Sequence, residues 1–200
     1  MTATASQQTM PQTIDHDASL DALWMPFTAN KAFKAKPRLL ISAKDMYYTA
    51  DDGRQILDGS AGLWCVNAGH CRAPIVEAIQ RAAASIDFVP AFQMGYPAAF
   101  DVANELAALL PAGIDRVFFS NSGSEAVDTA LKIALAYWRA RGEGQRCLFI
   151  GRERGFHGVG FGGISVGGMT NNRRAFGPAM LRSDHLRATY DAVTQAFVHG

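Results

Sequence analysis

The segment that most constrains the fold joins a short hydrophobic run to a long helical pattern through a small polar loop. Val117-Phe118-Phe119 forms the run, Ser120–Ser124 forms the loop, and a helix is expected from about Ser124 to Arg141. A continuous apolar run of this length is typical of a strand buried in a parallel sheet. A second strand is expected at Cys147–Ile150. Strand, helix and strand in this order predict a right-handed crossover within a three-layer α/β sheet.

The residues before this segment predict a small antiparallel meander. Leu39–Ser42, Met46–Thr49 and Gln55–Leu57 are the expected strands, and Asp51-Asp52-Gly53 supplies a turn between the last two. Two amphipathic helices should follow, one starting at Pro74 and one after Pro97, because proline is favoured in the first helical turn.

Three parts follow from this pattern. We expect a mobile polar tail at 1–18, a small-domain segment at 19–73, and the first part of a large α/β domain at 74–200. A further helix is expected to begin near Tyr190. Because a doubly wound sheet needs more strands than these, we expect the chain to be the N-terminal part of a larger protein.

Charge and composition exclude several classes of function. The net charge is +1, with 19 Lys and Arg against 18 Asp and Glu, so no basic surface for nucleic acid or acidic membranes is expected. Residues 1–20 lack the features of a signal or transit peptide, and no membrane helix is evident. Three cysteines without CxxC spacing indicate reduced thiols and a cytoplasmic protein. The low charged fraction of 18% indicates that a partner or further chain covers part of the surface.

The polar loop carries the strongest chemical signal. Unpaired N–H groups and the helix dipole favour an anion at the start of a helix. Gly123 would let a ligand approach the backbone, and Ser122 and Ser124 add hydroxyl donors. The alternative is a plain capping box, since Ser122-x-x-Glu125 fits S-x-x-E. The two interpretations are compatible, because Glu125 could hold the loop while the backbone binds a phosphate.

A glycine-rich stretch at 155–172 is expected to form loops and contains two further signals. Phe156, flanked by glycines, could lay its ring on a planar ligand, but Phe156 could equally be a core residue and His157 a surface histidine. Gly158–Gly163 matches the dinucleotide pattern G-x-G-x-x-G. That fingerprint must follow a strand directly and open a helix, and neither condition is expected here.

Two other residue groups have ordinary explanations. Cys65, His70 and Cys71 could ligate a metal, but the fourth ligand is missing and the spacing fits no common zinc site, so no metal is expected. Asp128 and Lys132 are expected to form an i,i+4 pair on the helix surface.

Five segments, in this order, make the sequence similar to a known family. The chain resembles the class III pyridoxal-phosphate aminotransferases, and most closely the branch that moves amino groups from β-alanine and other omega-amino acids to pyruvate. The matching segments are Trp24–Asn30, Asp58–His70, Pro90–Pro97, Val117–Trp138 and Gly155–Gly168. The resemblance implies a fold-type I α/β enzyme that uses pyridoxal 5'-phosphate, takes an amino donor and a keto acid, and works as a homodimer with shared active sites.

The resemblance also implies roles for residues at the cofactor. Gly123 and Ser124, with Ser122 beside them, would hold the cofactor phosphate. Phe156 would stack on the pyridine ring, and His157 would support its loop. Many relatives carry tyrosine at the position of Phe156, so stacking would be kept here and any hydrogen bond from that hydroxyl would be lost.

Other implied roles concern the substrate and the catalytic lysine. Phe27 and Trp64 would line the substrate pocket, and Phe92 would reach the active site of the neighbouring subunit. The chemistry needs a Schiff-base lysine and an acidic partner for the pyridinium nitrogen, which in the family come after the glycine-rich loop. None of the five lysines, at positions 31, 34, 36, 44 and 132, has a matching context.

We therefore expect this chain to contain no catalytic residue and to be inactive alone. Two alternatives stay open: a non-catalytic subunit that pairs with a complete aminotransferase, and a nucleotide-binding α/β protein that uses G-x-G-x-x-G.

Overall fold

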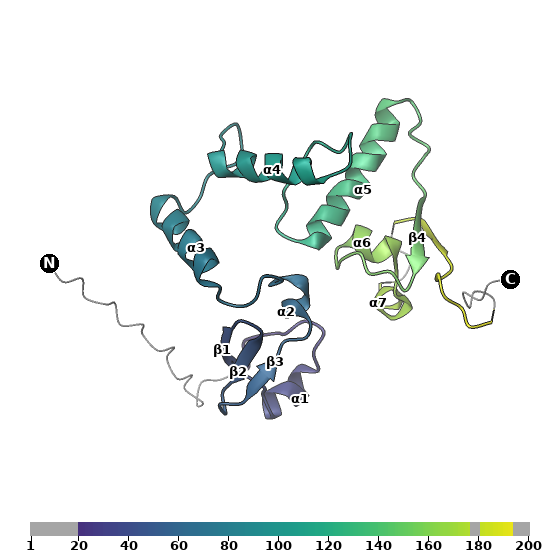
Figure 1. Ribbon diagram of the computed structural model, residues 1–200. Helices are drawn as coiled ribbons and strands as arrows, with labels where there is room; N and C mark the ends of the chain where they lie inside the picture. Colours follow the sequence, from purple (N-terminus) through teal and green to yellow (C-terminus); the bar gives the residue numbers. More distant parts are fainter. Residues whose placement is uncertain (1–19, 177–180, 194–200) are drawn as a thin grey trace. The chain divides into compact units, whose positions relative to one another are not determined.

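The structure, a computed structural model, describes residues 20–176 and 181–193 (Figure 1). The chain divides into two compact units. The first unit spans Met1–Tyr96 and the second Pro97–Gly200. The expected mobile tail at 1–18 lies outside the described residues. A helix was expected to begin near Tyr190. Residues 190–193 are not helical, and residues 194–200 lie outside the described residues.

The first unit is built on a three-stranded antiparallel sheet. Its strands are β1 (Leu40–Lys44), β2 (Tyr47–Ala50) and β3 (Gln55–Leu57), in the order β1-β2-β3. Gly53 sits in the turn between β2 and β3 with φ of 84°, a left-handed conformation that glycine adopts without steric cost, and its N–H donates to the Ala50 carbonyl at 2.9 Å. The predicted meander is confirmed, with strand bounds shifted by two residues at most.

Three helical segments accompany this sheet. α1 (Asn30–Ala35) was not expected from the sequence, α2 (Ala61–Trp64) is a single turn, and α3 (Ala73–Ser85) is the helix expected at Pro74. Pro74 lies in the first turn of α3, where its missing N–H would have no helical partner anyway. The positions of Ile75, Ile79 and Ala82 place apolar side chains along one side of this helix, which ends before Ile86.

The second unit contains the two long helices that the sequence predicts. α4 spans Pro97–Leu109 and α5 spans Gly123–Ala140. The strand expected at Val117–Phe119 is wrong, because residues 114–120 are irregular and pair with no strand among the described residues. A strand needs neighbours for its backbone hydrogen bonds, and an apolar run alone does not supply them.

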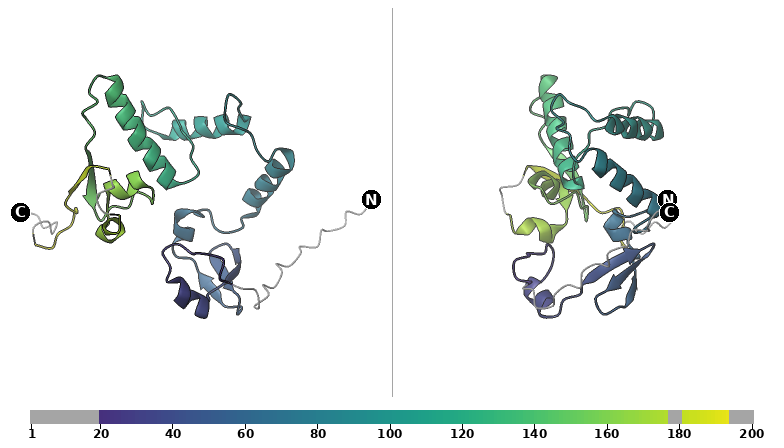
Figure 2. Two further views of the ribbon diagram at one scale, coloured as in Figure 1. Left: turned by 180° about the vertical axis from the view of Figure 1, so that it is seen from behind. Right: turned by 90° about the vertical axis from the view of Figure 1, so that its left-hand side faces the viewer.

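A small parallel sheet forms the other part of the second unit. Its strands are β4 (Phe149–Glu153), β5 (Gly167–Gly168) and β6 (Ser183–Leu186), in the order β5-β4-β6, and both pairs are parallel. Helix α6 (Phe161–Val166) packs beside β4, as both views in Figure 2 show. The expected strand at Cys147–Ile150 is therefore present but shifted toward Glu153, and the architecture is α/β.

The prediction that residues 155–172 form loops is wrong for much of this glycine-rich stretch. It contains helix α6, strand β5 and the start of a short helix, α7 (Thr170–Arg174). Gly162, Gly163, Ser165 and Val166 of α6 are buried, so tertiary packing stabilises a helix whose glycines disfavour it.

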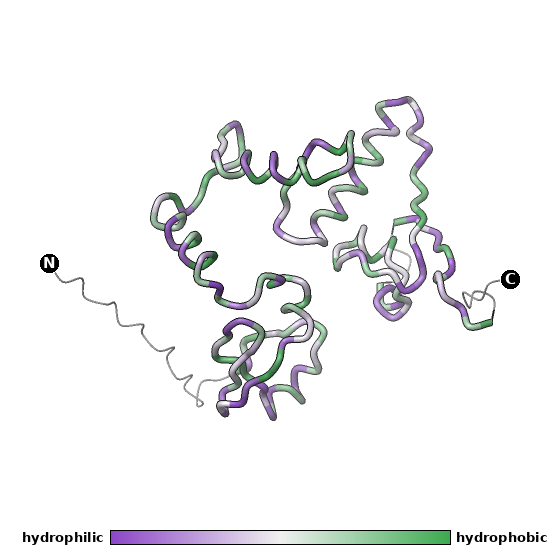
Figure 3. Tube along the Cα trace, viewed as in Figure 1, coloured by the Kyte–Doolittle hydropathy of each residue, from purple (hydrophilic) through white to green (hydrophobic). Residues whose placement is uncertain are grey.

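Large apolar side chains remain accessible over much of both units. Among the described residues, Ala50 of the first unit and Val166 of the second are the hydrophobic residues that form the buried core, with 3% and 8% of their surface exposed. Figure 3 shows hydrophobic and hydrophilic positions alternating along α3 and α4. Each helix therefore presents an apolar side that the described part of its own unit does not cover.

Candidate functional site

The loop before α5 is held by a capping arrangement. Ser122 is the N-cap in extended conformation, and its Oγ accepts from the Glu125 N–H at 3.2 Å. The Glu125 carboxylate accepts from the Asn121 N–H at 2.8 Å, and the Ser120 hydroxyl donates to the Ser122 carbonyl at 3.0 Å. The capping interpretation is thus confirmed, with one difference: Glu125 reaches the N–H of Asn121 rather than that of Ser122 itself.

Four donors of this loop remain available after capping. Gly123 and Ser124 occupy the first two helical positions, whose N–H groups have no acceptor within a helix. The Ser124 Oγ accepts from the Val159 N–H at 3.0 Å, as the Ser122 Oγ does from Glu125. Because both hydroxyl oxygens already accept, their hydrogens can be donated outward. Two N–H groups and two hydroxyls therefore meet at the positive end of the α5 dipole.

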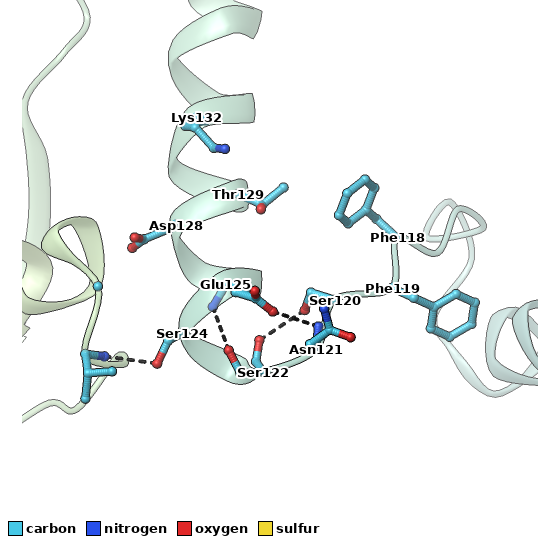
Figure 4. A pocket seen from close by; sticks show the side chains of 12 residues that line it. Phe118, Phe119, Ser120, Asn121, Ser122, Ser124, Glu125, Asp128, Thr129 and Lys132 are labelled. Carbon is cyan, nitrogen blue, oxygen red and sulfur yellow. Dashed lines mark hydrogen bonds between the residues drawn. The ribbon is translucent and has the colours of Figure 1, made fainter. Parts of the chain in front are cut away.

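This loop borders an open pocket of about 640 Å³ (Figure 4). Figure 4 shows Thr129 and Lys132 on the side of α5 that faces Phe118, whereas Asp128 points to the opposite side. Gly123 has open space where a side chain would begin, so nothing obstructs the approach of a ligand to its backbone. The pocket lining consists of Phe118, Phe119, Ser120, Asn121, Ser122, Ser124, Glu125, Asp128, Thr129, Lys132, Val159 and Gly160.

The glycines of Gly158–Gly163 pack against α5. Gly158 has φ of 106°, and a Cβ there would lie 2.7 Å from the Ser124 Cα. A Cβ on Gly160 would overlap the Asp128 carboxylate, and one on Gly162 would lie 2.7 Å from the Asp128 Oδ1. The glycine spacing is therefore explained by close contact between this segment and one side of α5.

Asp128 joins α5 to α6. Its Oδ1 accepts from the Gly163 N–H at 2.8 Å, which satisfies one of the free donors in the first turn of α6. The expected Asp128–Lys132 pair is wrong: no ion pair joins them in the part of the chain that the structure describes. The expectation that the G-x-G-x-x-G pattern opens no helix is also wrong, since α6 begins at Phe161, inside the pattern.

Phe156 and His157 lie next to this contact but outside the main pocket. Both line a separate small cavity together with residues of α6 and α7. Phe156 is 53% exposed, which argues against the interpretation that it is a plain core residue. Gly158, two residues on, touches Ser124, so the aromatic segment and the serine loop are neighbours in the second unit.

The aromatic residues expected at the substrate belong to the first unit. Phe27, Trp64 and Phe92 are 81%, 79% and 88% exposed. Because they lie in a different unit, the structure does not bring them together with the serine loop, and their substrate role stays a prediction.

The backbone around Trp64 is left-handed. Residues 61–64 have φ values of 49°, 57°, 57° and 70°, so α2 is one left-handed turn. Such a conformation costs an L-residue about 1–2 kcal/mol, and in this turn only Gly62 escapes that cost. The turn is closed by bonds from the Trp64 N–H to the Ser60 carbonyl at 3.1 Å and from the Cys65 N–H to the Ala61 carbonyl at 2.9 Å.

Asp58 and His70 form a largely buried pair that the sequence analysis missed. The Asp58 Oδ2 and the His70 Nε2 are 2.8 Å apart, with side chains only 5% and 12% exposed. The His70 ring lies against Tyr48, with ring centroids 4.4 Å apart. Asp58 and His70 are the first and last residues of the segment DGSAGLWCVNAGH. Their placement at the two ends of one long turn is the sequence feature that could have predicted their pairing.

The environment of Asp58 favours its charged form. Removal from water raises the pKa of the carboxyl, but hydrogen bonds from the Ser60 N–H, His70 and the Gly62 N–H outweigh that effect and hold the pKa at about 2. Burial, followed by the nearby Asp58 carboxylate, raises the pKa of the Tyr48 hydroxyl.

The described residues contain no group of three or more His, Cys, Asp or Glu side chains placed to hold a metal ion, and Cys65 and Cys71 are free and exposed. None of the helices over the same residues has both the length and the apolar character needed to cross a membrane.

The model of one protein family, aminotransferase class-III, matches residues 29–197. The chain is a class III aminotransferase family member. A curated omega-aminotransferase from Caulobacter vibrioides is 60% identical over 171 residues, which are 86% of this chain and 39% of the relative. A β-alanine–pyruvate aminotransferase from Pseudomonas aeruginosa is 44% identical over 176 residues, 88% of this chain and 39% of the relative.

Solved structures of transaminases share the fold. An (S)-enantioselective omega-transaminase from Thermomicrobium roseum matches with a TM-score of 0.82 and 31% identity, over 87% of this chain and 39% of that one. An amine transaminase from an uncultivated Pseudomonas species, in its PLP-bound form, matches with a TM-score of 0.78 and 33% identity, over 86% and 39%. The family uses pyridoxal 5'-phosphate, and this class III chain spans about 39% of the length of the relatives it matches.

Proposed function

We propose that the loop at Ser122–Ser124 binds the phosphate of pyridoxal 5'-phosphate in an omega-amino acid:pyruvate aminotransferase. The observation that carries this proposal is the group of four free donors at the start of α5: the N–H groups of Gly123 and Ser124 and the hydroxyls of Ser122 and Ser124. A phosphate dianion needs several donors and a positive potential, and a helix N-terminus supplies both.

Nearby carboxylates do not oppose a phosphate at this position. Glu125 is bound to the Asn121 N–H, and Asp128 is bound to the Gly163 N–H across the helix. Both negative charges are therefore committed to backbone donors, which leaves the N-terminal donors of α5 for the ligand.

The remaining assignments extend this proposal to the ring and the substrates. Phe156 stacks on the cofactor ring and His157 supports its segment, while Phe27, Trp64 and Phe92 contact the substrate. The cofactor supplies an electron sink for the substrate's α carbon once a lysine and an acidic residue complete the site. The names of the relatives support an omega-amino acid such as β-alanine as donor and pyruvate as acceptor.

The assembly and the domain arrangement belong to the same proposal. Two copies form a homodimer with shared sites, the segment 19–73 belongs to a small domain, and the segment from 74 onward begins a three-layer α/β domain. Exposed apolar sides on α3 and α4 are consistent with further chain or a partner covering them.

Calorimetric titration of the 200-residue chain with two ligands tests the phosphate site. Pyridoxal 5'-phosphate should bind, and pyridoxal, which lacks the phosphate, should bind at least 10-fold more weakly. Ser122→Gly removes a hydroxyl while keeping a good N-cap, and should weaken binding at least about 10-fold, because a hydrogen bond to a charged group contributes about 1.5–3 kcal/mol.

The matched control is Ser42→Ala, an exposed serine on β1 in the other unit, which should bind as the unaltered chain does. Equal affinities for the two ligands, or no effect of Ser122→Gly, would contradict a phosphate site at this loop.

A further inference from the structure

The left-handed turn at 61–64 is held from one side by a single carboxylate. The Asp58 Oδ1 accepts from the Ser60 N–H at 3.0 Å and from the Ser60 hydroxyl at 3.1 Å. The Asp58 Oδ2 accepts from the Gly62 N–H at 2.8 Å and also lies 2.8 Å from the His70 Nε2. Because the carboxylate contacts the residue before the turn and one inside it, it fixes how the chain enters the left-handed conformation.

His70 ties that carboxylate to the sheet. Its backbone forms a two-way bridge with Asp45, with N–H to carbonyl distances of 3.0 Å and 2.7 Å. Its ring contacts Tyr48 on β2. The ring is thus held from the backbone and from one side, and its Nε2 points at Asp58.

Side chains also pack closely against the Cα of Gly62 in this turn. A Cβ at that position would lie 2.9 Å from the Val66 Cγ1 and 3.4 Å from the Tyr48 hydroxyl oxygen. Packing alone therefore excludes larger residues at Gly62. It does not explain why Ala61, Leu63 and Trp64 keep positive φ values, which each of them would lose by relaxing to an ordinary turn.

We propose that Asp58 and His70 are positioning residues that hold residues 61–64 in the left-handed turn and thereby fix the place from which Trp64 reaches the substrate. The inference rests on the proposed substrate role of Trp64. Trp64 itself makes few contacts, being 79% exposed, so its direction is set by the backbone of the turn. Strained backbone that surrounding contacts maintain is typical of functional sites.

Hydrogen exchange of the 200-residue chain, followed by NMR, tests the positioning role. In Asp58→Asn, an amide NH₂ replaces one acceptor oxygen, so the amides of Gly62 and Cys65 should exchange at least 10-fold faster. The amide of Tyr48 in β2 should keep its rate. The matched control is Asp45→Asn, which removes an exposed carboxylate that pairs with Arg72 at 3.0 Å and should leave the Gly62 and Cys65 rates unchanged.

Two substitutions of His70 separate positioning from general packing. His70→Gln keeps a donor near the place of Nε2, so the Gly62 amide should exchange more slowly in His70→Gln than in His70→Phe. His70→Phe keeps a ring against Tyr48 but has no donor, and should accelerate exchange as Asp58→Asn does. Unchanged exchange at Gly62 in Asp58→Asn overturns the proposal, and so does equal acceleration at Gly62 and Tyr48, which would indicate a merely structural role.

A kinetic comparison keeps this inference distinct from the function on which it rests. In the native enzyme that carries this sequence, Asp58→Asn should raise KM for the amino donor several-fold with kcat and cofactor affinity retained. A fall in kcat together with cofactor affinity would contradict positioning. If Trp64→Ala leaves donor KM unchanged while Asp58→Asn still frees the turn, the substrate role of Trp64 fails and the hold on the turn stands.

Discussion

Gly160 lies against the carboxylate of Asp128, and no room remains there for a methyl group. Gly158 and Gly162 are similarly close to α5. A pattern that matches a dinucleotide fingerprint is therefore used here to bring one backbone segment against one helix. The contact matters for the proposed site, because the same segment places Phe156 beside the serine loop.

Gly160→Ala tests this close contact at the level of one residue. The added methyl group must displace the Asp128 carboxylate and strain its bond to the Gly163 N–H, so the second unit should lose about 1–3 kcal/mol of stability, as overpacking usually costs. Urea unfolding followed by NMR at the amides of α5 measures the change. Gly144→Ala is the control. A Cβ at Gly144 would lie 3.9 Å from its nearest neighbour, so the loss of stability should stay within about 0.5 kcal/mol. Equal effects of the two substitutions would count against the contact.

Among the elements, the turn α2 and the sheet β1–β3 are coupled through Asp58, and this coupling should depend on pH. The folded pKa of Asp58 is about 2, below its usual value of 3.8, so the carboxylate stabilises the folded turn above about pH 4. That contribution should be lost as the pH falls from about 4 through 2, when Asp58 takes up a proton. His70 and Tyr48 are the titratable groups in contact with it.

The amide chemical shift of Gly62 between about pH 5 and about pH 1 measures this loss and should titrate with a midpoint near 2. In Asp58→Asn the shift should stay flat over the same range. Asp52, whose pKa is lowered by its hydrogen bonds with Arg54, titrates in the neighbouring turn, so Asp52→Asn serves as the control and should keep the Gly62 transition. A Gly62 midpoint near 4 would show that Asp58 lacks the partners described above.

Local patterns predict some elements well and others poorly, for physical reasons. The strands β1–β3 and helices α3–α5 depend on alternation, helical spacing and proline or serine at their starts, all of which can be read within a few residues. The strand expected at Val117–Phe119 fails because its partners are not set by its own residues. Helix α6 was missed because contact with Asp128, far away in sequence, overrides the weak helix propensity of its glycines.

The candidate site divides in the same way. Ser122, Gly123 and Ser124 can be found from sequence, because a strand-like run, small polar residues and a helix start are adjacent along the chain. The pairing of Asp58 with His70 requires two residues to meet across a left-handed turn, and no propensity predicts four consecutive positive φ values.

At the scale of the whole molecule, the decisive test is whether any lysine of this chain forms a Schiff base with pyridoxal 5'-phosphate. The sequence analysis predicts that none of the five lysines forms the Schiff base, and Lys132 is exposed on α5. Borohydride treatment of the 200-residue chain with pyridoxal 5'-phosphate should label no lysine stoichiometrically, and the chain alone should form no alanine from β-alanine and pyruvate. Peptide mass mapping and alanine assay measure both. One specifically labelled lysine, or alanine formation, would contradict the prediction.

The contacts described above also imply an order of folding. Asp58 and His70 are 12 residues apart, whereas the bonds of Ser124 with Val159 and of Asp128 with Gly163 each span 35 residues. Closing the longer loop costs about 1 kcal/mol more in chain entropy. During synthesis the buried pair is complete once residue 70 has left the ribosome, while the serine loop lacks its glycine neighbours until Gly163 emerges. The serine loop should therefore be the later of the two to acquire a fixed shape in a nascent chain.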